Sequence, residues 1–303
     1  GAIPDRYGTD PLARTSGQWF NSPPLTLDGL KGKVVLVDFW TYSCINCLRT
    51  MPYLKAWQER YGKAGLVIVG VHSPEFAFEQ DAGNVQAAIK SIGVTWPVVQ
   101  DNAFGIWNAF SNRYWPAHYL FDKSGKLVDS HFGEGAYDDT ERMIQTLLGQ
   151  TPGDLSAAAV PANVAADSVN PETYLGSARG QVLPAPDSQG SYHLTGVLPQ
   201  FGWGLAGNWQ RSDEFIESAA ASSLSLDFQA QSVFVVISLV DGNQAELTVS
   251  ANGRPVQTND VKNGRLVPDR SRLYQVFAGT GVTKGELLIQ VKGMVRLHAF
   301  TFS

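Results

Sequence analysis

Two short apolar runs in the first third of the chain have the length and the β-branched content of buried strands. They are "GKVVLVDFW" at 32–40 and "GLVIVGVH" at 65–72. Between them, residues 46–61 carry apolar side chains at helical spacing, and Gly62 then suits a helix C-terminus. The order strand, helix, strand predicts a parallel sheet. Asp38 interrupts the apolar pattern of the first run.

The alternation of helical and extended patterns continues to about residue 150. The expected elements are a helix at about 80–92, a strand at 96–100, a helical patch near 106–110, extended stretches at 116–122 and 127–132, and a helix at about 137–148. The turn "KSGK" between the two extended stretches makes them a predicted hairpin. The pattern therefore predicts an α/β domain over residues 1–150.

The pattern changes after residue 150. Residues 151–170 are rich in Ala, Pro and Ser and show no sustained period, which is typical of a linker. From 171 to 303, short β-rich runs such as "SLSLDFQA", "SVFVVISLV" and "GELLIQVKG" alternate with turn signals. The Asn-Gly pairs at Asn252-Gly253 and Asn263-Gly264 suit tight turns, the first of them a hairpin. This second region is predicted to be an all-β sandwich.

Composition and charge exclude some function classes. The 303 residues are 44% apolar, enough to bury a core in each of two domains. The net charge is −5, without a Lys/Arg-rich block that could bind phosphates, so nucleic acid is not an expected partner. The longest apolar run, at 233–240, has eight residues where a spanning helix needs ~20. We expect a soluble chain, and whether it is a fragment of a membrane-attached protein stays open.

The chain has two cysteines, Cys44 and Cys47, at the junction of the first predicted strand and the first predicted helix. A disulfide between residues this close restrains the unfolded chain little, so a structural staple is a weak explanation. Structural zinc needs four Cys or His ligands, and the five histidines show no spacing that completes a site. We therefore expect thiol chemistry, with no metal and no cofactor beyond a redox-active disulfide. Carriage of copper or zinc by the two thiols is an alternative.

The positions of the cysteines suggest different tasks. At a helix start, unpaired backbone N–H groups and the positive end of the dipole favour a thiolate at Cys44. Cys47, one helical turn further, lies on the same face within reach of the first sulfur, as a resolving thiol requires. Asp38 would be a costly carboxylate inside a strand unless protonated or hydrogen-bonded, so it could hold a proton for Cys47. An outward-facing Asp is the alternative, and a structural or solvated role is expected for His118.

These motifs resemble the thioredoxin superfamily through much of the first 150 residues. In "VDFWTYSCINC", Asp38 stands six residues and Trp40 four residues before the first cysteine, as in thioredoxins. Pro116 in "RYWPAHYLFDKSGK" matches the superfamily's cis-proline, which faces the disulfide and shapes the substrate groove. The resemblance implies catalytic roles for Cys44, Cys47, Asp38 and Pro116 and substrate contacts for Trp40 and Trp115.

A narrower resemblance suggests a location and an electron donor. The extra helix and strand between residues 72 and 100 resemble the insertion of TlpA-like thioredoxins, which act outside the cytoplasm. "FWTYSCINCLRTMPYLKAW", "WPAHYLFD" and the β-rich module together resemble the soluble C-terminal region of the DipZ family of cytochrome c biogenesis proteins. In that family a CcdA-like membrane domain passes electrons to the thioredoxin domain. The resemblance implies an extracytoplasmic thiol:disulfide oxidoreductase of protein clients, membrane-anchored in its full-length form.

The β-rich module resembles carbohydrate-binding jelly rolls in its strand pattern. Its amphipathic aromatic residues could offer rings to sugar faces, although core positions are the commoner place for such side chains. The candidates are Tyr174, Tyr192, Trp203 and Trp209. A cell-envelope glycan-binding protein with a secondary redox domain is therefore the alternative function, with cell-wall carbohydrate as its partner.

Overall fold

The computed structural model describes residues 10–156, 160 and 170–303. The chain divides into two compact units, Gly1–Asn163 and Val164–Ser303. The linker expected at 151–170 falls largely on residues 157–159 and 161–169, which lie outside the described residues. Within the described ranges, no helix has both the length and the apolar character needed to cross a membrane.

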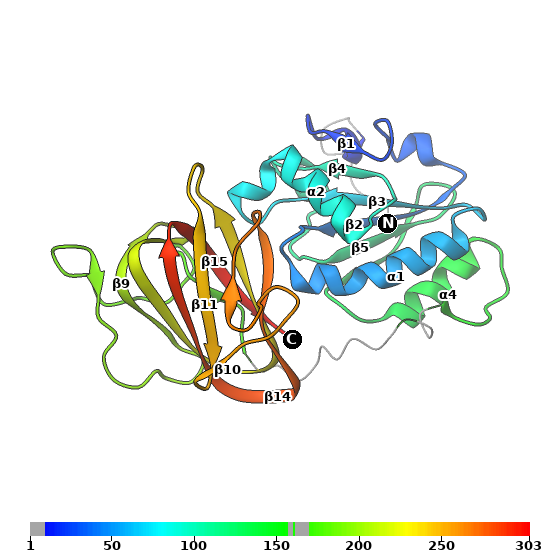
Figure 1. The fold of residues 1–303 in the computed structure, drawn as a ribbon. Coiled ribbons are helices and arrows are strands. Elements are labelled where there is room, and N and C mark those ends of the chain that lie inside the picture. Colours follow the sequence, from blue (N-terminus) through cyan, green and yellow to red (C-terminus); the bar gives the residue numbers. More distant parts are fainter. Residues whose placement is uncertain (1–9, 157–159, 161–169) are drawn as a thin grey trace. The chain divides into compact units, whose positions relative to one another are not determined.

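A six-stranded sheet with the order β1-β4-β3-β2-β5-β6 forms the centre of the first unit (Figure 1). Its strands are β1 (Trp19–Phe20), β2 (Val34–Trp40), β3 (Leu66–His72), β4 (Val98–Gln100), β5 (Ala117–Phe121) and β6 (Leu127–Phe132). As the strand–helix–strand order predicts, β2, β3 and β4 pair in parallel. β5 and β6 form the predicted antiparallel hairpin, and β5 pairs with β2.

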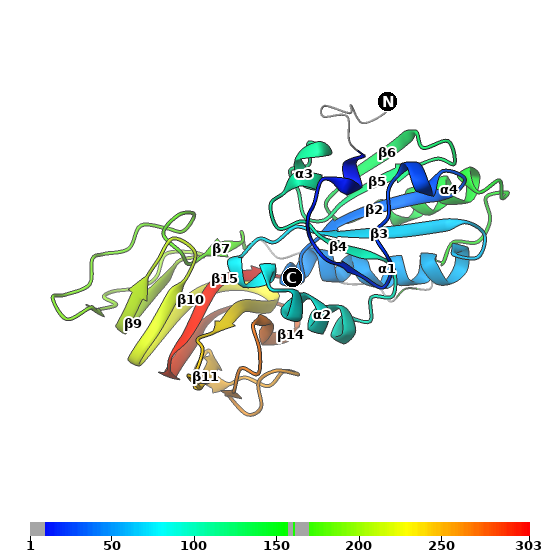
Figure 2. The same ribbon diagram turned by 90° about the horizontal axis from the view of Figure 1, so that it is seen from above.

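Helices cover both faces of this sheet. They are α1 (Ile45–Tyr61), α2 (Ala82–Ile92), α3 (Gly105–Ala109) and α4 (Tyr137–Leu147), with 3-10 turns η1 (Pro11–Ala13), η2 (Asp28–Leu30) and η3 (Ala77–Gln80). Because side chains alternate along a strand, Leu36 and Trp40 of β2 pack in one core with α1, α2 and α4. Val37 and Phe39 pack in a second core with α3, which lies across the sheet from α1 (Figure 2). Asp38 therefore faces α1.

The second unit is an all-β sandwich, as predicted. Its strands are β7 (Thr173–Tyr174), β8 (Ser191–Tyr192), β9 (Trp203–Arg211), β10 (Ile216–Leu239), β11 (Ala245–Ala251), β12 (Arg254–Pro255), β13 (Arg265–Leu266), β14 (Arg272–Gly293) and β15 (Val295–Phe302). Residues 222–226 of β10 lie between β9 and the second half of β14. Residues 233–237 lie between β15 and the first half of β14. The two long, curved strands pass from one layer to the other around a shared core (Figure 1).

The long strands differ from the pattern expected from the sequence. The runs "SLSLDFQA" and "SVFVVISLV" predict two separate strands, but both belong to β10. The register shifts between Ala230 and Ser232, where the strand bends without breaking, and this shift interrupts the alternation of the side chains. The Asn252-Gly253 hairpin is confirmed: both residues have positive φ, 51° and 79°, and they connect β11 to β12.

Candidate active site at the start of α1

Cys44 is the N-cap residue of α1. Its backbone is extended (φ −87°, ψ 110°), and its Sγ accepts a hydrogen bond from the backbone N–H of Cys47 at 3.2 Å. The first turn of the helix carries no acidic side chain that would oppose the positive end of its dipole. Cys44 is half-buried and its thiol is free, so the sulfur is held at the helix start with part of its surface accessible.

Cys47 lies one turn further along α1 and is completely buried. Burial raises the pKa of its thiol well above the usual value, and the neighbouring Cys44 and the charge of Asp38 add to the rise. Cys47 is therefore held as a protonated thiol. Cys44 is the sulfur that another molecule can reach. The two sulfurs lie where the sequence placed them at the start of the helix, and their separate roles in exchange stay a prediction.

Asp38 lies on the face of β2 that packs against α1, and it is completely buried. Its Oδ1 is 3.1 Å from Nε2 of His118, the residue directly opposite on β5. This contact has ion-pair distance without the angles of a hydrogen bond, and neither Asp38 oxygen has a hydrogen-bond partner among the described residues. Burial raises the pKa of Asp38, and His118 opposes that rise. A buried carboxyl whose charge acts on Cys47 can take up the proton of that thiol.

Two buried polar side chains hold the segment that leads into Cys44. Nε2 of His72 accepts the Tyr42 N–H at 3.2 Å, and burial lowers the pKa of this histidine to about 3, so it is neutral. Oε2 of Glu79 accepts the Ser43 N–H at 3.0 Å and the Thr41 hydroxyl. The backbone between β2 and the first cysteine is thus fixed by side chains from β3 and η3.

Trp115 and Pro116 lie where β5 begins. The peptide bond between them is cis, as predicted. The carbonyl of Pro116 accepts the Gly133 N–H at 2.8 Å, and the indole N–H of Trp115 donates to the Ser73 carbonyl at 2.8 Å. Trp115 is half-buried and packs against the core that contains both cysteines. Part of its aromatic surface is therefore accessible.

Trp40 does not offer the substrate contact expected from its resemblance. It is 0% exposed, and its ring packs edge-on against His72 with centroids 4.9 Å apart. The reason is the alternation of β2, which turns Trp40 to the α1 face together with Leu36. Trp40 supports the base of the site as a core residue.

Three residues at the site carry no functional signal of their own in the sequence: His72, Glu79 and His118. His72 ends a predicted strand, and Glu79 stands in "SPEFAFEQ", where an acidic residue resembles a surface position. His118 was expected to be structural or solvated; it is buried, with its Nε2 3.1 Å from Oδ1 of Asp38. Asp38 and His118 are each a polar residue within an otherwise apolar strand. Because a buried polar group needs a polar partner, this shared feature is the signal that could have paired them.

No group of three or more His, Cys, Asp or Glu side chains that could hold a metal ion occurs within the described ranges. Carriage of copper or zinc by Cys44 and Cys47 stays an untested alternative.

The aromatic residues expected to bind sugars are mostly unavailable. Trp203 and Trp209 are 3% and 4% exposed and belong to the core of the second unit. The Tyr174 ring is covered by the Arg179 guanidinium, 3.6 Å from its centroid. The two tryptophans thus occupy core positions, the commoner place expected for such side chains.

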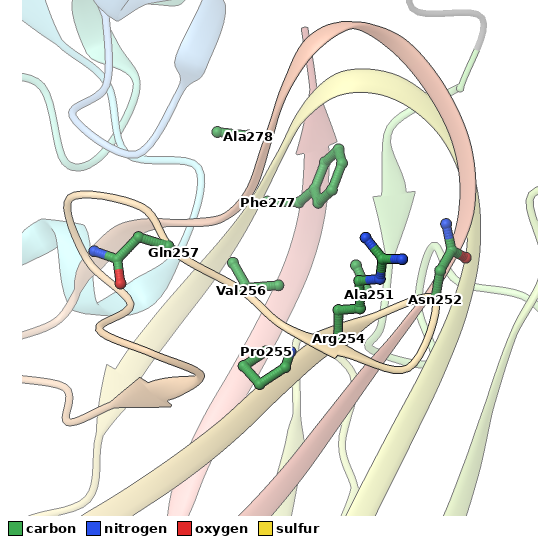
Figure 3. Close-up of a pocket in the computed structure, with 8 residues that line it drawn as sticks. All are labelled: Ala251, Asn252, Arg254, Pro255, Val256, Gln257, Phe277 and Ala278. Carbon is green, nitrogen blue, oxygen red and sulfur yellow. The ribbon is translucent and has the colours of Figure 1, made fainter.

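A different hollow of about 590 Å³ opens beside the β11–β12 hairpin. Its lining combines the Phe277 ring with the side chains of Asn252, Arg254 and Gln257. Figure 3 shows the Phe277 ring and the Arg254 guanidinium directed toward the same space, whereas Gln257 points away from it. The hollow has one aromatic face and flanking hydrogen-bond donors.

Two family models match the chain. The Redoxin family matches residues 21–148, and a family described as "Thioredoxin like C-terminal domain" matches residues 170–303. The thiol-disulfide oxidoreductase YkuV of Bacillus subtilis (strain 168) is 30% identical over 144 residues, which cover 46% of this chain and 96% of YkuV. The chain belongs to the thioredoxin superfamily of thiol-disulfide oxidoreductases.

A second relative matches both units of this thioredoxin-superfamily chain. Protein DipZ of Mycobacterium tuberculosis (strain CDC 1551 / Oshkosh) is 31% identical over 308 residues, which cover 97% of this chain and 43% of DipZ. The chain thus spans less than half the length of that relative. Among solved structures, the solution structure of a thioredoxin-like protein in the oxidized form is 28% identical and covers 50% of this chain and 97% of its own, with a TM-score of 0.42. Both units of this superfamily member are thus similar to DipZ.

Proposed function

We propose that the chain exchanges thiols and disulfides with protein clients outside the cytoplasm through Cys44 and Cys47. The observation that carries the proposal is the unequal exposure of the two sulfurs: Cys44 is half-buried at the helix start, and Cys47 is completely buried. A client disulfide reaches only the first of them. Cys44 is therefore the attacking thiol and Cys47 the resolving thiol.

The exchange has two steps. In the first, the Cys44 thiolate attacks a client disulfide, forms a mixed disulfide and releases one client sulfur as a thiolate. In the second, Cys47 gives its proton to Asp38 and attacks the Cys44 sulfur, and the second client sulfur leaves with the electron pair. The client is then reduced and the Cys44–Cys47 pair is oxidised. Trp115 and Pro116 border the site and are assigned to contact the client.

A CcdA-like membrane domain is the proposed source of electrons. The chain has no cysteine besides Cys44 and Cys47, so each turnover leaves it oxidised until an external dithiol reduces it. The resemblance to the DipZ family supports both this donor and the location outside the cytoplasm. The match to DipZ over 97% of the chain, while covering 43% of DipZ, supports a larger protein around this region.

The test is to trap the mixed disulfide. Replacement of the resolving thiol, Cys47→Ser, arrests exchange with the partner attached to Cys44, and mass spectrometry of the envelope fraction identifies it. The double variant with both cysteines replaced by Ser is the control and should trap nothing. Capture of a CcdA-like domain or of apocytochrome thiols, with wild-type protein mostly reduced in cells, is the expected result. A mostly oxidised wild-type protein that traps only newly exported reduced proteins would show an oxidase instead.

The hollow beside the β11–β12 hairpin supports a second candidate function, binding of cell-envelope glycans. An aromatic face and convergent donors, here Phe277, Asn252 and Arg254, are the groups that sugar recognition uses. Calorimetric titration of the whole chain with cell-wall glycan fragments should give saturable binding that Arg254→Ala weakens. Absence of heat across a broad set of glycans would leave a scaffolding role for the second unit.

A further inference from the structure

A row of residues crosses the sheet from beneath the cysteines to its edge. In the pairing of the strands, Asp38 of β2 stands opposite His118 of β5, and His118 stands opposite His131 of β6. Directly paired residues of antiparallel strands point to the same face, with Cβ atoms ~4.5–5.5 Å apart. Three proton-exchanging side chains therefore follow one another on the face covered by α1.

The row changes from buried to accessible along its length. Asp38 is 0% and His118 is 4% exposed, whereas His131 is half-buried on the edge strand β6. Nε2 of His131 lies 2.9 Å from the Glu134 carbonyl oxygen in the turn that follows. The buried end of the row lies in the field of Cys47, and the other end reaches solvent.

The contact between Asp38 and His118 is poorly explained by packing. Both carboxyl oxygens and Nε2 of His118 are buried without a hydrogen-bond partner among the described residues, although Oδ1 and Nε2 are 3.1 Å apart. Buried polar groups without a hydrogen-bond partner destabilise a fold, and an apolar side chain at position 38 or 118 would avoid this cost. An imidazole can both accept and release a proton near neutral pH, which an apolar side chain cannot.

We propose that His118 is a proton-path residue that takes the proton from Asp38 and passes it toward solvent at the His131 edge. The proposal rests on the role of Asp38 in the proposed function. During resolution the Cys47 proton moves to Asp38, the Cys47–Cys44 bond forms and the Cys44–client bond breaks. As this bond forms, the proton moves on from Asp38 to Nε2 of His118, which releases one from Nδ1 to water. The carboxylate is thereby restored for the next turnover.

Other titratable groups surround this pair and set the background for its pH dependence. Strand β3 contributes none opposite Asp38, because Gly70 is the paired residue there. The titratable groups on the other neighbouring elements include Cys44, Cys47 and Arg49 of α1, Asp129 and His131 of β6, Glu134 of the following turn and Tyr137 of α4. Arg49 and Glu134 are bound to each other by an ion pair of 2.8 Å, so their charges largely compensate locally.

The experiment is a double-mutant cycle read by stopped-flow mixing. Reduced protein is mixed with a fluorescent peptide disulfide from pH 5 to pH 9, which gives a first phase for mixed-disulfide formation and a second for resolution. The variants are Asp38→Asn, His118→Gln and both together, with His118→Asn as a second replacement. The amplitude of the first phase counts the folded, reactive molecules in every sample.

The sign of the expected shift follows from the protonation of the base. A protonated Asp38 cannot accept the Cys47 proton, so the second phase slows below the pKa of Asp38. His118 lowers that pKa, so its removal should move the acid limb of the second phase to higher pH. On the acid limb the second phase of His118→Gln should be slower than that of the wild type, by less than the ~10²–10⁴ that a positioned base contributes. The first phase should not change.

The outcomes separate this inference from the proposed function. A double variant that behaves like Asp38→Asn alone supports action of His118 through Asp38. A His118→Gln profile that overlies the wild-type profile, or one lowered equally at every pH, overturns the inference. If Asp38→Asn slows resolution and His118→Gln does not, the proposed function stands without His118. If Asp38→Asn has no effect on resolution, the assignment of Asp38 fails and the inference fails with it.

Discussion

Glu79 offers a direct test of whether the segment before Cys44 must be held in place. Its side chain is completely buried, and each of its two carboxylate oxygens accepts hydrogen bonds. Oε2 faces the Ser43 N–H at 3.0 Å and the Thr41 hydroxyl, and Oε1 faces the N–H groups of Glu75 at 3.2 Å and Phe76 at 3.0 Å. Burial raises the pKa of Glu79, while these donors favour its charged form.

The substitution Glu79→Gln turns one of the two oxygens into an NH2 group, which cannot accept. With the NH2 toward Glu75 and Phe76, it would stand against two backbone N–H groups. With the NH2 toward Thr41 and Ser43, it stands against one N–H, because the Thr41 hydroxyl can turn and accept. The second arrangement is favoured, and it leaves the buried Ser43 N–H without an acceptor, which costs about 1–3 kcal/mol. For a domain of this size each kcal/mol lowers Tm by about 2–4 °C.

The loss should also reach the chemistry, because Ser43 directly precedes Cys44. We expect faster hydrogen exchange at the Ser43 amide and a several-fold lower rate of exchange with a client disulfide. Glu141→Gln is the matched control: this buried carboxyl accepts from Tyr61 and Ser156, far along α1 from the thiols. It should lower Tm by a similar amount without changing the thiol kinetics. Equal kinetic effects of the two variants, or unchanged protection of Ser43, would refute a positioning role.

Three further predictions concern the thiols, the pH dependence of folding and the second unit. Alkylation of the reduced protein should modify Cys44 well before the buried Cys47, as peptide mapping over time will show; equal rates would contradict the assignment of the attacking thiol. Because burial lowers the pKa of His72 to about 3, its contribution to stability is complete above the unfolded value of about 6.5. As the pH falls from 6.5 toward 3, the free energy of unfolding should decrease by roughly 1.4 kcal/mol per pH unit because of His72. Denaturation of His72→Gln at the same pH values should lack this slope. Gly253→Ala places a side chain at φ 79° and should destabilise the second unit by roughly 1–2 kcal/mol in urea, whereas Gly281→Ala, with open space and no positive φ, should be nearly neutral.

The sequence pattern predicted most helices and strands of the first unit, because their apolar spacing and turn residues follow the usual preferences of helices and strands. The hairpin strand at 127–132 is found with the same bounds, and the helix expected at 46–61 is Ile45–Tyr61. Apolar spacing and turn residues act within a few positions, so such elements can be found without the fold. The two cysteines and Asp38 stand out for the same reason, since each breaks or ends a local pattern.

Contacts between distant segments were beyond the reach of those patterns. Glu79 is 36 positions from Ser43, and its neighbours in the sequence look like an exposed turn. Trp40 was assigned to the substrate because its position matches a motif, yet its exposure depends on which face of β2 the helix covers. The bends of β10 and β14 likewise depend on strands that pair with each half separately.

The pairing of Asp38 with His118 illustrates how a long-range register controls a site. A slip of β5 by one residue against β2 would place Ala117 or Tyr119 opposite Asp38 and turn His118 to the face of α3. That slip is opposed by apolar burial, because Leu120 packs in the core beneath α1 while Tyr119 packs in the opposite core. Residues that never touch Asp38 thus determine which side chain stands beside it, and through that side chain its readiness to accept a proton.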